Sequence, residues 1–157
     1  MPTLPEDLRE PFDRFVRGPT LVRTALDGVD PGTLNRRPKG GDWSIRDLVM
    51  HIVENELVQA VRFRMVIAGG EQPLPVFDRE LWKRRLHYLW RDPELAISLF
   101  QQARYSNAEL LQQCDRASWD RTGECPELGT VSLAQLLRNA ADHSDSEAGR
   151  IREFREA

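Results

Sequence analysis

The sequence lacks three features that mark common functional classes. None of its apolar runs approaches the roughly 20 residues of a membrane-spanning helix, so we expect no membrane association. The formal net charge of −3 provides no basic excess, so we expect no nucleic-acid partner. The N-terminus opens with prolines and acidic residues and has no basic-then-apolar signal segment. These absences favour a cytoplasmic protein.

Cysteine is also scarce. Cys114 and Cys125 are the only two, and they form no CxxC pair, so both are expected to be free thiols in a reducing compartment. Cys114 falls on an apolar stripe and is expected in the core. Cys125 is expected in a loop. A free cysteine is more often inert packing, and a reactive thiol is the alternative.

What the chain does have is an ordinary globular composition. Apolar residues make up 40% of it and charged residues 30%, as in soluble folded proteins. A length of 157 residues suits one domain, covering residues 1–157, with a single sizeable core.

The spacing of apolar residues by threes and fours predicts four long amphipathic helices. Their first and last recognisable positions are Leu8 and Leu26, Ser44 and Gly69, Asp92 and Cys114, and Ser132 and Phe154. Two starts have the spacing of capping boxes, Ser44 with Asp47 and Ser132 with Gln135. These signals place the second and fourth helices most firmly.

The segments between and within these helices complete the expected fold. Gly18-Pro19 interrupts the first apolar pattern, which resumes in phase, so we expect one kinked helix there. An amphipathic piece from Trp82 to Trp90 is expected to cross over and pack on the core, although it could instead cover a pocket or meet a second subunit. Residues 115–129 are expected to form a loop. Without a convincing strand, the pattern predicts an all-α, four-helix bundle.

Ionisable side chains lie on or beside the apolar stripes of the second and fourth helices. The second helix carries His51, Asn55 and Glu56, and the fourth carries His143 and Glu147 four residues apart. Side chains at this spacing project from one helix face at neighbouring levels and can chelate one ion. An ionised group near a core must be paired, neutralised or bound to a metal. The pattern therefore predicts a site of two histidines and one carboxylate, if the two helices face each other.

Two other interpretations of these residues stay open. His143 and Glu147 could form an ion pair along an exposed helix face. The whole polar group could instead be a hydrogen-bonded network in the core, without any chemistry.

Two stretches of the chain resemble the DinB-like superfamily of four-helix bundles, whose relatives include bacillithiol S-transferases and mycothiol-dependent maleylpyruvate isomerases. One is Trp43-Ser44 followed by His51, and the other is the approach from Gly129 through Leu137 to His143. The resemblance implies an up-down-down-up topology with a long crossover after the second helix. It also implies frequent homodimers.

The same resemblance implies a divalent metal, usually zinc or nickel, held by three histidines with a water at an open position. His51 matches the first ligand and His143 the second, whereas Glu147 stands where the family has its third histidine. A carboxylate there favours harder ions such as manganese or iron. Asn55 and Glu56 are expected to support the ligands.

Characterised relatives imply an activity in which the metal activates a low-molecular-weight thiol for attack on an electrophile. We therefore expect a small-molecule substrate and either a thiol S-transferase or a hydrolase that uses activated water. The competing interpretation is a non-catalytic, dimeric bundle with a degenerate metal site, which binds a small ligand or a protein partner.

Overall fold

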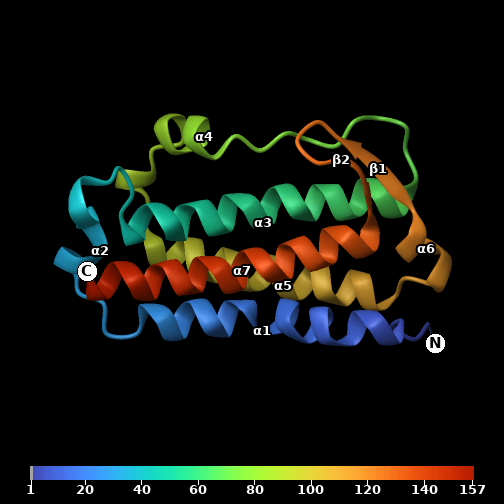
Figure 1. Cartoon of the computed structure of the whole chain (residues 1–157), viewed down its shortest axis with the longest axis horizontal. Coiled ribbons are helices and arrows are strands. Elements are labelled where there is room, and N and C mark those ends of the chain that lie inside the picture. Colours follow the sequence, from blue (N-terminus) through green and yellow to red (C-terminus); the bar gives the residue numbers. More distant parts are fainter. Residues whose placement is uncertain (1) are drawn as a thin grey trace.

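A computed structural model describes residues 2–157 and shows a bundle of four long helices. They are α1 (Arg9–Leu26), α3 (Ile45–Ala68), α5 (Pro93–Gln112) and α7 (Leu133–Glu156). In Figure 1, α1 and α7 run in one direction while α3 and α5 run in the other. This order is up-down-down-up, so the expected four-helix bundle is confirmed. Within residues 2–157, no helix is long and apolar enough to cross a membrane.

Short elements join the four helices. They are the 3-10 helices η1 (Glu6–Leu8), η2 (Pro38–Gly40) and η3 (Tyr88–Trp90), the helices α2 (Pro31–Asn35), α4 (Arg79–Arg85) and α6 (Arg116–Asp120), and the strands β1 (Thr122–Cys125) and β2 (Gly129–Ser132). The connection that contains α4 and η3 returns along the bundle, which lets α5 run parallel to α3 (Figure 1).

Local sequence signals set the ends of α3. Ser44 caps its start: the Asp47 amide donates to Ser44 Oγ, and Asp47 Oδ2 accepts in return from the Ser44 amide. The helix stops after Ala68 because Gly69 adopts a left-handed backbone with a φ of 79°, which suits a residue without Cβ. The capping box predicted from the sequence is therefore confirmed at Ser44.

A buried polar layer separates the apolar core into two clusters. One cluster contains Phe15, Phe63 and Leu111, and the other contains Val22, Ile52 and Phe100. Between them, Arg104 of α5 is 1% exposed and Glu56 of α3 is 0% exposed. Arg104 reaches all three neighbouring helices, donating to the Glu56 carboxylate, the Phe15 carbonyl of α1 and the Ser144 hydroxyl of α7.

The contact between Arg104 and α1 explains how α1 passes through a proline. Pro19 has no amide hydrogen to donate to the carbonyl of Phe15, four residues earlier. Arg104 Nη1 donates to that carbonyl instead, over 2.7 Å. The prediction that one helix runs through Gly18-Pro19 is confirmed, because α1 extends from Arg9 to Leu26.

Gly18 lies against the same guanidinium, which predicts a large effect for one added methyl group. A Cβ at position 18 would lie 2.6 Å from Arg104 Nη1 and 2.8 Å from Ser144 Oγ. Both atoms are held by hydrogen bonds, so neither can move freely. Gly18→Ala is therefore expected to lower the free energy of unfolding in urea by about 1–3 kcal/mol.

The matched control for Gly18 is Gly149→Ala in α7. A Cβ at position 149 would meet only the end of Arg152, at 4.0 Å. Alanine is the better helix former, so this variant should be unchanged or more stable by up to about 1 kcal/mol. Equal effects of the two substitutions would contradict the packing described at Gly18.

The segment from residue 115 to 129 differs from the expected loop. It contains α6 and β1, and β1 pairs with β2 in a short antiparallel hairpin that reaches residue 132. Thr122 pairs with Ser132, and Cys125 pairs with Gly129. The strands have four residues each and only one buried residue apiece, so the apolar alternation that indicates a strand is weak. Cys125 ends β1 and is 2% exposed, which corrects its expected place in a loop and favours inert packing.

Candidate metal centre

The two histidines of the predicted site meet between α3 and α7. His51 is buried on α3, and its Nε2 lies 2.8 Å from Nε2 of His143 on α7. Their ring centroids are 4.9 Å apart, with the rings inclined at 64°. The convergence expected from the helix patterns is what the structure shows.

Glu147 joins the two imidazoles one helical turn after His143. Its carboxylate Oε1 lies 3.9 Å from His143 Nε2. One donor atom from each of His51, His143 and Glu147 lies within 4.8 Å of the others. Arg150, three residues further on, contacts the same carboxylate over 3.2 Å. Arg150 was not predicted as part of the site, although its spacing of three residues from Glu147 was a usable signal.

Burial sets the protonation of these three groups. It lowers the pKa of His51 to about 2 and that of His143 to about 4, and nearby arginine charges act in the same direction. Burial raises the pKa of Glu147, an effect that Arg150 opposes. Both imidazoles are therefore neutral near pH 7, which is the form that binds metals.

Asn55 supports His143 from α3. Its Nδ2 lies 3.2 Å from Nδ1 of that ring. A half-turn of the amide would present Oδ1 as an acceptor for an Nδ1–H, leaving Nε2 unprotonated. Such a contact orients a histidine whose other nitrogen binds a metal.

Glu56 does not lie beside the histidines as expected. Its carboxylate accepts from Arg104 at 2.7–3.0 Å and from Asn107 Nδ2 at 3.0 Å. This pairing corrects its predicted role. The helical pattern showed that Glu56 faces the bundle interior, but it could not show which helix supplies the partner.

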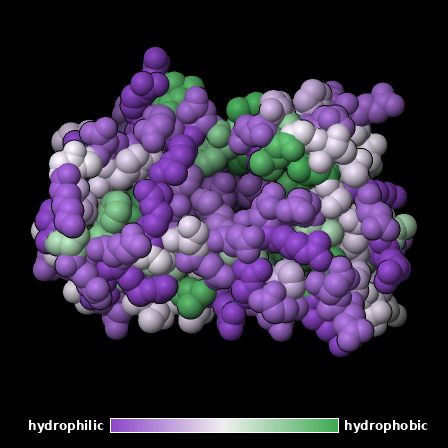
Figure 2. Space-filling view, viewed as in Figure 1, coloured by the Kyte–Doolittle hydropathy of each residue, from purple (hydrophilic) through white to green (hydrophobic). Residues whose placement is uncertain are grey.

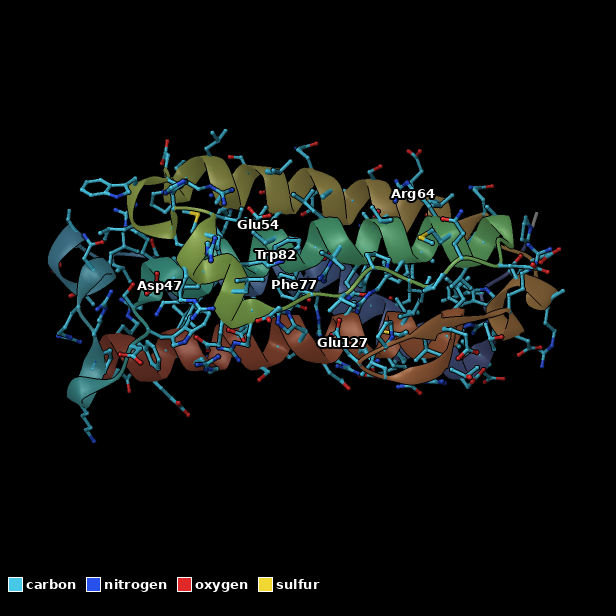
Figure 3. All side chains as sticks on the ribbon, turned by 90° about the horizontal axis from the view of Figure 1, so that it is seen from above. Asp47, Glu54, Arg64, Phe77, Trp82 and Glu127 are labelled. Atoms are coloured by element: carbon cyan, nitrogen blue, oxygen red, sulfur yellow. The ribbon has the colours of Figure 1, made fainter. Side chains whose placement is uncertain are left out.

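Aromatic side chains cover His51 from outside the bundle. Phe77, in the segment before α4, stacks on the imidazole with centroids 5.3 Å apart and planes 21° apart. Trp43 meets the same ring edge-on at 5.8 Å. Trp82 of α4 packs edge-on against Phe77 at 4.8 Å, and Figure 3 shows these two side chains together above α3. The first part of the Trp82–Trp90 crossover thus covers the site, whereas Trp90 is 82% exposed.

One side of the centre opens to the surface. Figure 2 shows a hydrophilic hollow over the middle of α3 and α7, with hydrophobic side chains along part of its rim. The side chain of His143 is 25% exposed, whereas that of Glu147 is 6% exposed. A small molecule could therefore approach along the His143 side.

The donor set fits a divalent cation. Two imidazole nitrogens and one carboxylate oxygen are competent ligands for zinc, iron or manganese. Three protein ligands leave a coordination position for water or substrate, as catalytic sites require. The ligand atoms come from two packed helices, so their convergence is set by the packing of α3 against α7.

Comparisons with known proteins agree with this description. The model of one family, described as the DinB superfamily, matches residues 14–146. A provisionally named metal-dependent hydrolase of Oceanobacillus iheyensis is 20% identical over 80% of this chain and 72% of its own. A Bacillus licheniformis protein with the same provisional name is 21% identical over 88% of this chain and 80% of its own.

Two solved structures share the fold. YfiT from Bacillus subtilis, a four-helix bundle provisionally assigned as a metal-dependent hydrolase, matches with a TM-score of 0.88 at 17% identity, over 97% of this chain and 88% of that chain. The mycothiol-dependent maleylpyruvate isomerase matches with a TM-score of 0.75 at 17% identity, over 95% of this chain and 62% of that chain.

Proposed function

The chain belongs to the DinB superfamily, and from this premise we propose that it is a divalent-metal-dependent enzyme whose ion is held by His51, His143 and Glu147. The reaction that we favour is hydrolysis of a small electrophilic substrate by activated water. Transfer of a low-molecular-weight thiol to such a substrate is the second candidate.

One observation carries this proposal. Both Nε2 atoms and the Glu147 carboxylate gather in one place, although they come from helices that are far apart in the sequence. Two neutral imidazoles alone could share one Nε2–H···Nε2 hydrogen bond, but such a bond does not involve the Glu147 carboxylate beside them. A metal ion uses all three groups, because it binds unprotonated imidazole nitrogens and a carboxylate oxygen together.

The residues around the centre have distinct parts in this chemistry. A bound divalent cation would lower the pKa of water or of a thiol, making an anion available near neutral pH. Glu147 supplies a negative charge, and Arg150 keeps that carboxylate oriented. Phe77 and Trp43 cover His51 and exclude solvent from that side of the ring. The exposed edge of His143 is the proposed side of entry for substrate.

The two candidate reactions draw on different relatives. The provisional names of the Oceanobacillus and Bacillus proteins support hydrolysis. The similarity to the mycothiol-dependent isomerase supports a thiol, since 95% of this chain matches its fold. Zinc or nickel suits the histidines, whereas manganese or iron suits Glu147.

An activity test separates the candidates. Untagged protein would be stripped of metal and then reloaded with zinc, nickel, manganese or iron. Each form would be assayed with activated esters, and with an electrophile plus cysteine as the thiol. We expect turnover only in a reloaded form, and loss of that turnover in His143→Ala.

The products identify the reaction. Ester hydrolysis without thiol supports the hydrolase, whereas thioether formation supports the S-transferase. The absence of metal-dependent turnover with either set of reagents would favour the non-catalytic bundle.

A further inference from the structure

The segment between α3 and α4 places Phe77 over the candidate metal ligand His51. The two rings are nearly parallel, with centroids 5.3 Å apart. Phe77 lies in a stretch without helix or strand, so no element of regular structure fixes its backbone. Something else must hold the segment against the bundle.

A backbone bond from the Leu74 amide to the Glu124 carbonyl holds the start of the segment, and two charged side chains hold the part next to Phe77. Arg62 of α3 donates to the Pro75 carbonyl from Nε at 3.1 Å and from Nη2 at 2.7 Å. Glu127, in the hairpin turn, accepts from the Phe77 amide at 2.6 Å and from Arg62 Nη2 at 2.9 Å. We call Arg62 and Glu127 the clamp. Figure 3 shows Glu127 on the hairpin beside the segment that leads to Phe77.

The clamp fixes the backbone on both sides of an exposed residue. Val76 lies between its two contacts and is 52% exposed, so the clamp does not serve to bury that side chain. The clamp instead holds the backbone of Phe77, whose ring stacks on His51. Arg62 is itself nearly buried, with 3% of its side chain exposed, so a charge has been desolvated to make this contact.

Arg62, the clamp residue on α3, lies too far along the helix to touch the metal ligands. Position 62 lies three helical turns beyond position 51, which corresponds to roughly 16 Å along the axis. Arg62 and Glu127 neutralise each other, so the pair carries little net charge that could act over this distance. We therefore expect the clamp to act on the centre through the segment that carries Phe77.

We propose that Arg62 and Glu127 are positioning residues that hold Phe77 on His51 and thereby slow the escape of the bound metal ion. This inference rests on the metal centre proposed above. It adds that the hairpin, which contributes no ligand, controls how long the ion stays.

The test is metal release from zinc-loaded protein after mixing with an excess of a chromogenic chelator. Glu127→Gln is expected to release zinc about tenfold faster than the wild type, because a hydrogen bond to a charged acceptor is among the stronger ones. Phe77→Ala should be at least as fast. Glu124→Gln is the matched control, since this exposed carboxylate of the same hairpin contacts only Thr130 among the described side chains and should leave the rate unchanged.

A double variant separates positioning from a general loosening of the fold. If the clamp acts through Phe77, then Glu127→Gln should add nothing to the release rate of Phe77→Ala. The proposal would be overturned if the double variant released zinc faster than Phe77→Ala by the same factor that Glu127→Gln shows alone. It would also be overturned if Glu127→Gln released zinc at the wild-type rate. Failure of the wild type to hold any of zinc, nickel, manganese and iron would instead overturn the metal centre itself, so the two failures are distinguishable.

Discussion

Arg104→Met is expected to lower the free energy of unfolding by about 3–5 kcal/mol. The substitution keeps most of the side-chain volume but removes, among residues 2–157, the only cation that hydrogen-bonds to Glu56. Glu56 is 0% exposed, so its charge would be left without compensation inside the bundle. The Phe15 carbonyl, already without a helical partner because of Pro19, would lose its donor too. Urea unfolding followed by circular dichroism measures the change.

A compensated variant tests the reason for this loss. Removing both charges with Glu56→Met and Arg104→Met should recover much of the stability, because an apolar pair carries no desolvation penalty. The pair of single variants and the double variant form a cycle, and we expect a strong coupling between the two positions. A single variant within about 0.5 kcal/mol of the wild type would show that the buried pair does not hold the four helices together.

His51→Ala and His143→Ala are each expected to abolish tight binding of a divalent metal. Each removes one of the three donor groups that lie within 4.8 Å of one another. Loss of a partner that merely orients a ligand typically costs 10–100-fold in affinity, so loss of a ligand should exceed roughly 100-fold. Competition for zinc against a chelator of known affinity measures the change.

The third histidine of the chain provides the control. His87 is exposed and adopts a left-handed backbone with φ of 56°, which asparagine tolerates well. His87→Asn should therefore bind zinc as the wild type does. If it lost as much affinity as His51→Ala, the measured zinc would not be bound at the proposed centre.

The sequence pattern predicted the helices directly, and it predicted the meeting of the ligands on the condition that the second and fourth helices face each other. Apolar residues at helical spacing marked α1, α3, α5 and α7, and the Ser44–Asp47 box marked the start of α3. Because an amphipathic helix turns its apolar stripe to the core, His51 and His143 beside two such stripes were expected near the bundle interior. The family resemblance supplied the topology that made them neighbours.

Partners across helices could not be predicted in the same way. The position of Glu56 on its helix was clear, but nothing in α3 shows that Arg104 would be its partner rather than a metal-binding histidine. A helix pattern gives the direction of a side chain, whereas its partner depends on the relative height of another helix. The same limit hid the link between Pro19, Phe15 and Arg104.

The short segments were the least predictable part. The strands of the hairpin are four residues long, so their local sequence carries little signal. Phe77 follows two prolines in an irregular connection, and its contact with His51 depends on Glu127, fifty residues later in the chain. The homodimer and the cytoplasmic location stay predictions, which sedimentation and fractionation can test.

A crystal structure of the metal-loaded protein, with anomalous diffraction recorded at the absorption edge of that metal, tests the central claim most directly. The account predicts one strong anomalous peak within bonding distance of His51 Nε2, His143 Nε2 and the Glu147 carboxylate, at about 2.0–2.2 Å for zinc. A peak elsewhere on the chain, or a loaded crystal without any peak between α3 and α7, would contradict it.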